Sequence, residues 1–200
     1  MAINLANNNS LANITALPSS VSGGAMTLLA TQTASGSATL SFTSGIDSTY
    51  DEYVFKYYNI HPATDNADFE FNMTIDGTNW NVTKTTTTFY SYHMEDNSGA
   101  GLTYEAAYDL AQGTGFQYLA ADIGNGNDES ASGSMVLYNP SSTTFVKHFL
   151  HSGNRYVGSN ISANDFVAGY GNTTSSVTGI QFKMSSGNID SGVIKLYGIS

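Results

Sequence analysis

Residues 68 to 75 read Asp-Phe-Glu-Phe-Asn-Met-Thr-Ile, an uninterrupted alternation of polar and apolar residues that decides the fold class. Side chains along an extended strand point to opposite faces in turn, so the four apolar residues share one face. These four are Phe69, Phe71, Met73 and Ile75. The next dipeptide, Asp76-Gly77, is typical of hairpin turns and predicts a second strand that begins near Trp80.

Similar short segments rich in β-branched and aromatic residues recur along the chain and predict further strands. They are residues 26–31, 37–43, 52–58, 81–90, 134–138, 144–151, 165–170, 179–184 and 193–199. About ten short strands separated by turn residues are typical of an all-β, antiparallel β-sandwich. We expect specifically a jelly roll.

One segment, Tyr104 to Ala111, has the composition of a short helix of at most two turns, stopped by Gly113 and Gly115. The rest of residues 95–133 is rich in Gly, Asn and Asp, and predicts long loops. Loops held on a rigid sandwich are where binding residues are often found.

Residues 1–24 differ from the rest of the chain, because their apolar residues are isolated among Asn and Ser and they end in Gly23-Gly24. We interpret them as an N-terminal docking arm that precedes a single β-sandwich domain, residues 25–200. A disordered tail is an equally weighted alternative. The apolar residues that would dock are Ile3, Leu5, Leu11, Ile14, Leu17 and Val21.

Charge and composition exclude several classes of protein. The chain has six Lys or Arg against sixteen Asp or Glu, a net charge of −10, which argues against binding to nucleic acid. It has no Cys, so disulfide frameworks and thiol chemistry are excluded. No apolar run approaches the roughly 20 residues of a membrane span, and the N-terminus does not resemble a secretion signal. We therefore expect no membrane partner.

No catalytic motif is found. Gly-x-Ser-x-Gly and Ser-x-x-Lys are missing from the sequence. His148 and His151 are three apart, so in a strand they face opposite ways and do not suit one metal ion. Glycoside hydrolysis needs two carboxylates, but the adjacent acidic pairs at 51–52, 95–96 and 128–129 are typical of solvated surface. We predict no catalytic residue and no enzyme activity.

Two binding sites are considered. The segment from Asp122 to Glu129 is dense in oxygen donors and flexible Gly, which suits calcium, with an ordinary acidic loop as the default interpretation. Its candidate ligands are Asp122, Asn125, Asn127, Asp128 and Glu129; no other cofactor is predicted. Exposed aromatics near predicted loops could stack on host glycans, although core packing explains most aromatics in a sandwich. These candidates are Trp80, Tyr90, Tyr92 and Tyr104.

Three stretches carry a resemblance: LSFTSGIDSTYDEYVFKYYNIHPATDNADFEF (40–71), NPSSTTFVKHF (139–149), and FVAGYGNTTSSVTGIQFKMSSGNIDSGVIKLYGIS (166–200). They resemble small virion structural or tail-fibre-like proteins of marine tailed bacteriophages, over roughly residues 26–200. The resemblance implies a virion protein made in the bacterial host cytoplasm and displayed on the outer surface of the particle. It carries no catalytic motif.

These observations leave three hypotheses for function. A head decoration protein comes first, with the major capsid protein as a partner. A tail-fibre or receptor-binding tip that contacts host surface glycans comes second, and a polysaccharide-degrading enzyme is a distant third. We also predict a homotrimer, because 24 aromatic residues exceed the need of one core and few charged side chains keep copies apart.

Overall fold

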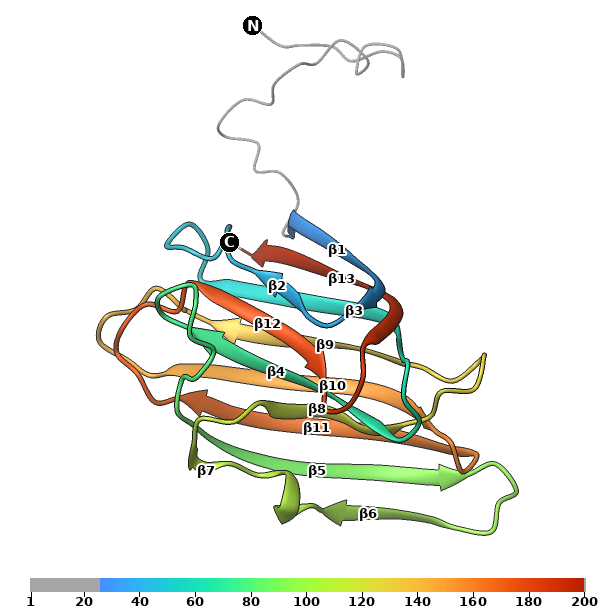
Figure 1. Ribbon diagram of the computed structural model, residues 1–200. Coiled ribbons are helices and arrows are strands. Elements are labelled where there is room, and N and C mark those ends of the chain that lie inside the picture. Colours follow the sequence, from blue (N-terminus) through green and yellow to red (C-terminus); the bar gives the residue numbers. More distant parts are fainter. Residues whose placement is uncertain (1–25, 200) are drawn as a thin grey trace, which may run out of the picture.

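The computed structural model describes residues 26–199, and these form an antiparallel β-sandwich (Figure 1). Within that range the regular structure is thirteen strands and one turn of 3-10 helix, Ala106–Tyr108. In chain order the strands are β1 (Thr27–Ser37), β2 (Leu40–Phe42), β3 (Glu52–Pro62), β4 (Ala67–Thr74), β5 (Lys84–Met94), β6 (Ala100–Tyr104), β7 (Ala111–Gly113), β8 (Gln117–Ile123), β9 (Ala131–Tyr138), β10 (Lys147–Val157), β11 (Ile161–Gly171), β12 (Gly179–Met184) and β13 (Ile189–Ile199). None of the helical structure in this range is long and apolar enough to cross a membrane.

Eight of the strands have the connectivity of a jelly roll. One layer runs β1-β13-β3-β9 and the other runs β2-β12-β4-β8, with every neighbouring pair antiparallel. Early strands therefore lie beside late ones in both layers, which is the pattern made by two Greek keys. The prediction of an all-β sandwich, and of a jelly roll within that class, is confirmed.

Two insertions extend the first layer. Strands β5, β6 and β7 lie between β4 and β8 in the sequence, and strands β10 and β11 lie between β9 and β12. The insertions pair with each other, since β10 joins β9, β11 joins β10, and β5 joins β11. The resulting large sheet runs from β1 to β6 and extends past the small sheet of β2, β12, β4 and β8, as Figure 1 shows below β8. One residue pair, Val157 with Ile123, links the two sheets at β10 and β8.

Aromatic side chains fill the space between the sheets. Phe55 on β3 lies 5.4 Å from Phe182 on β12, and Phe71 on β4 lies 5.0 Å from Phe149 on β10, both between ring centroids. All four are at most 1% exposed. Each such side chain contributes about 1.5 to 3 kcal/mol when fully buried. The alternating residues of β4 supply this core, as the sequence predicts for Phe69, Phe71 and Met73.

A tight contact occurs where Tyr57 crosses the core. Its hydroxyl lies 2.8 Å from His151 Nε2, and the two rings stack at 11°. Gly133 and Gly153 are partners on β9 and β10, and both lie against that hydroxyl. Burial lowers the pKa of His151 to about 3, so the ring stays neutral. His151 is buried and His148 is exposed, which confirms that they face opposite ways.

The predicted hairpin after β4 is wrong. The chain does turn at Asp76-Gly77, and Gly77 has a φ of +79°, but β4 and β5 are not partners. The chain instead crosses to the far part of the large sheet, and the next strand begins at Lys84 rather than near Trp80. Ile75 is 43% exposed and lies outside the core. The returning segment buries the polar face of β4, where Asn72 Nδ2 donates to the Trp80 carbonyl oxygen at 2.6 Å.

The interpretation of residues 95–133 as loops is also wrong in part. That region holds β6, β7, β8 and the start of β9. The helix expected at Tyr104 to Ala111 is reduced to a 3-10 turn, because Tyr104 ends β6 and Ala111 begins β7. The predicted docking arm, residues 1–24 with Ile3, Leu5, Leu11, Ile14, Leu17 and Val21, lies outside the described residues.

Candidate functional site

A groove lies where the inner face of the large sheet runs past the small sheet. Tyr90 and Tyr92 alternate along β5, and their partners on β11 are Asp165 and Ala163, so all four point into this region. We call it the tyrosine groove; its volume is about 410 Å³. It is lined by Tyr90, Tyr92, Met94, Thr103, Asp122, Arg155, Val157, Ile161 and Ala163.

The two tyrosines form one wall of the tyrosine groove. Their ring centroids are 6.2 Å apart and the ring planes are tilted by 43°. Tyr92 lies over Gly101, its partner on β6, where an added Cβ would come within 2.9 Å of the ring. The Arg155 guanidinium lies 5.5 Å from the Tyr90 centroid, within the range of a cation–π contact. The groove therefore presents aromatic surface beside a cationic group.

Arg155 also forms a buried ion pair. Its Nε donates to Asp165 Oδ2 at 2.8 Å, and both side chains are only 4% exposed. Burial raises the pKa of Asp165 to about 6, an effect that Arg155 opposes. The pair holds the Arg155 side chain in the floor of the groove. Removing either partner would leave the other as an uncompensated buried charge.

An exposed carboxylate, Asp122, stands at the end of β8. Its φ is +48°, a left-handed conformation that is rare for a residue other than Gly. Its backbone N–H donates to Asp68 Oδ1 at 2.8 Å, and the Tyr108 hydroxyl donates to Asp122 Oδ2 at 3.3 Å. Burial raises the pKa of Asp68 and also that of Tyr108, where Asp122 adds to the effect. The groove thus brings an acceptor, Asp122, near a donor, Arg155.

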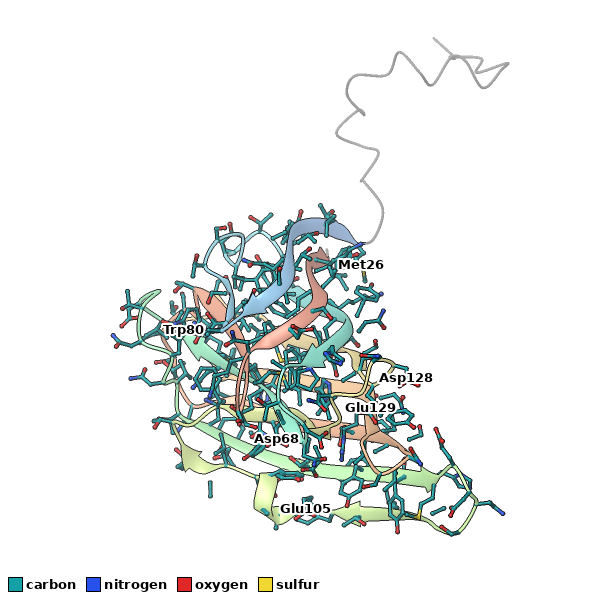
Figure 2. The ribbon with its side chains drawn as sticks, turned by 45° about the vertical axis from the view of Figure 1, so that its right-hand side comes forward. Met26, Asp68, Trp80, Glu105, Asp128 and Glu129 are labelled. Carbon is teal, nitrogen blue, oxygen red and sulfur yellow. The ribbon has the colours of Figure 1, made fainter. Side chains whose placement is uncertain are left out.

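The predicted glycan-contacting residues do not form one site. Tyr90 and Tyr92 meet in the tyrosine groove. Tyr104 pairs with Phe89 and lies on the opposite face of the sheet, where its hydroxyl donates to Asp109. Trp80 lies in the connection between β4 and β5, on the other side of the molecule from Asp128 and Glu129 in Figure 2.

Sequence reasoning missed Arg155 and Asp165. Both occupy inward positions of their strands, in phase with the buried Phe149 on β10 and Val167 on β11. A charged residue at an inward position of an alternating strand was the signal that could have found them.

Among the candidate calcium ligands, Asp122 and Glu129 accept hydrogen bonds from other residues. Glu129 Oε2 accepts from the Gly126 N–H at 2.6 Å, and the Asn125 N–H donates to Asp65 Oδ1 at 3.3 Å. Asn127 and Asp128 are exposed. Across residues 26–199, no three His, Cys, Asp or Glu side chains gather as a metal site would need. Calcium at Asp122, Asn125, Asn127, Asp128 and Glu129 therefore stays a prediction.

A second surface is the side of the large sheet that faces away from the small sheet, which we call the outer face. Nine large hydrophobic side chains are exposed within the described residues, and six of them lie on this face. The six are Leu28, Tyr58, Phe89, Leu102, Tyr104 and Leu150. They occur at both ends of the sheet and in its middle, from β1 to β6. Six of the nine exposed hydrophobic side chains thus share one face, which makes this face a candidate for an interaction surface.

Acidic residues avoid the outer face. The strands of the large sheet hold only Glu52, Asp165 and Asp190 of the sixteen acidic residues. Asp165 points inward, and the other two lie at the beginnings of β3 and β13. Lys56 and Lys195 lie on the outer face, near the rings of Tyr197 and Tyr58. The net negative charge of the chain is therefore carried by other surfaces.

Comparison with known proteins places the chain in no family: it matches no family model, no curated protein and no solved structure.

Proposed function

We propose that the chain is a non-enzymatic structural protein displayed on the outside of a tailed-phage virion, and that it assembles there as a homotrimer. The resemblance of residues 26–200 to marine phage virion proteins supports the virion role. A jelly roll is a common architecture for capsid and lectin domains, and this architecture is compatible with the role. Among virion roles, a head decoration protein that contacts the major capsid protein is the first candidate.

The outer face is the observation that carries the assembly. Exposed apolar side chains that share one face favour association through that face. Copies that meet through it bring little negative charge together, because the acidic residues lie elsewhere. Its apolar side chains lie at both ends of the sheet, with Leu28 on β1 and Tyr104 on β6. In a cyclic trimer, the β1 end of the outer face of one copy can pack against the β6 end of the next copy.

Sedimentation tests the assembly. Three copies of 21.2 kDa predict a particle of about 64 kDa at micromolar concentration. Leu102→Glu places a charge at the β6 end of the outer face, at a side chain 71% exposed, and should yield monomer. Ile75→Glu is the matched control, because Ile75 is 43% exposed but follows β4 of the small sheet, and this variant should remain trimeric. A wild-type monomer, or equal behaviour of the two variants, contradicts the proposal.

A second candidate, a tail-fibre or receptor-binding tip, is supported by the tyrosine groove. Copy number separates the two roles: hundreds per purified particle mean the head, and a few dozen or fewer mean the tail. Mass spectrometry of purified virions measures this.

A polysaccharide-degrading enzyme is the remaining alternative. Asp51, Asp96 and Asp128 are exposed, and Asp96 accepts from the Ser98 N–H, an ordinary turn contact. Replacing these residues and Glu129 should leave assembly and host adsorption intact. Release of reducing sugar by the wild type, lost on one of these changes, would establish an enzyme instead.

A further inference from the structure

We propose that the tyrosine groove binds one uncharged pyranose ring of a polysaccharide, with Tyr92 as the stacking platform and with Arg155 and Asp122 as the polar contacts. The inference deepens the second candidate function, and it is independent of the trimer. The groove lies on the inner side of the large sheet, so assembly through the outer face leaves it open.

The size and shape of the groove suit one sugar ring. Its volume of about 410 Å³ lies within the range of small-molecule sites, roughly 300 to 1,000 Å³. The tilted rings of Tyr90 and Tyr92 give one apolar wall, and Val157 and Ile161 add aliphatic surface. The C–H face of a pyranose is apolar, while its edge carries hydroxyls, so an aromatic wall beside polar groups matches both parts.

The Tyr92 ring is held ready for stacking. It lies against the backbone at Gly101, where any larger residue would meet the ring within 2.9 Å. An aromatic platform fixed in this way loses little side-chain entropy when a ligand binds, which favours affinity.

The polar groups suit hydroxyls. Arg155 uses its Nε on Asp165, and its terminal amino groups donate to no described residue. Tyr108 donates to one oxygen of the Asp122 carboxylate, and no described residue donates to the other. Each sugar hydroxyl both donates and accepts, so a donor and an acceptor lining one small groove can share neighbouring hydroxyls.

The charges of the groove disfavour an acidic ligand. Asp165 balances the charge of Arg155, so Asp122 is left as the unbalanced charge that lines the groove. A sugar acid would be repelled by Asp122, in a chain that already carries −10. A neutral sugar avoids this repulsion.

The backbone at Asp122 is consistent with a binding role. Its left-handed conformation is strained for a residue other than Gly, and such outliers gather at ligand sites. The hydrogen bond to Asp68 holds this conformation and sets the carboxylate at the groove.

The test is titration of the full-length protein with D-galactose, D-glucose and D-mannose, followed by ligand-observed NMR and calorimetry. At least one of these sugars should bind saturably with a millimolar Kd, about −4 kcal/mol. D-glucuronic acid should bind at least about tenfold more weakly than the best neutral sugar. No saturable binding of any neutral sugar, or tighter binding of D-glucuronic acid, overturns the proposal.

Variants locate the binding. Tyr92→Ala and Asp122→Asn should each weaken it about tenfold or more. Tyr104→Ala is the matched control, because Tyr104 is a tyrosine 61% exposed on the opposite face, and its loss should leave binding unchanged. Equal binding by Tyr92→Ala and the wild type overturns the assignment. Failure of sugar binding leaves the sedimentation result untouched, so the two proposals fail separately.

Discussion

Adding one methyl group at Gly153 should destabilise the whole domain, because no space exists for it. A Cβ at this position would lie closer than 3.0 Å to the Tyr57 hydroxyl, and 3.0 Å from His151 Nε2. The Tyr57 ring is 1% exposed and is packed 5.1 Å from Phe69, so it cannot move aside freely. Gly153→Ala must therefore displace the hydroxyl and break its hydrogen bond to His151.

The expected cost has two parts. Overpacking costs about 1 to 3 kcal/mol, and leaving a buried polar group without its partner costs about 1 to 3 kcal/mol more. The sum is about 2 to 6 kcal/mol of unfolding free energy, which should lower the Tm by at least about 4 °C in a chain of this size. Urea and thermal denaturation followed by circular dichroism measure both quantities.

Two further variants make the test specific. Gly115→Ala is the control, since a Cβ there meets nothing within 4 Å, and its Tm should stay within a few degrees of the wild type. Tyr57→Phe removes the oxygen that the new methyl group would strike. The double variant Tyr57→Phe with Gly153→Ala should therefore be less destabilised than the sum of the single changes, by about 1 kcal/mol or more. Strict additivity, or a wild-type Tm for Gly153→Ala, would refute this account of the contact.

Three other outcomes are expected. Burial lowers the pKa of Lys84 from 10.5 to about 7, so between these pH values the unfolded chain holds a proton that the folded chain lacks. The Tm should therefore rise from pH 7 to pH 9, and this rise should be smaller in Lys84→Met. Asp165→Asn leaves Arg155 unpaired and should cost about 3 to 5 kcal/mol in urea unfolding, whereas the exposed Asp190→Asn should cost little. Deleting residues 1–24 should leave the Tm of the β-domain unchanged but abolish attachment to virions; full occupancy by the truncated protein would show that attachment lies elsewhere.

The strands were predictable because their pattern is local. Alternation along β4 and β12 reports one buried face directly, and the segment 179–184 coincides with β12. The partner of each strand was not predictable, because it depends on contacts distant in sequence. Asp76-Gly77 is an example: the dipeptide predicts a turn correctly, but no residue near it indicates that the chain then crosses to the other sheet.

The candidate site was predictable only in part, for the same reason. Tyr90 and Tyr92 could be picked as aromatics near loops, and they do line a groove. Arg155 and Asp122 join them only through the pairing of β11 with β5 and the approach of β8 to β10, which join residues far apart in sequence. Tyr104 was grouped with the groove tyrosines, but the register with Phe89 turns it to the other face.

The position of β13 between β1 and β3 has a consequence for biosynthesis. β1 has β13 as its sole ladder partner among the described strands, and Thr27 pairs with Gly198. At about 5 to 20 residues per second, the ribosome needs roughly 10 to 30 seconds to make the chain between them. During that interval the β1 end of the outer face does not exist, because β13 supplies Lys195 and Tyr197 to it. A chain cut short before residue 189 thus lacks one end of the surface through which we propose that copies meet, so this assembly would accept only finished subunits.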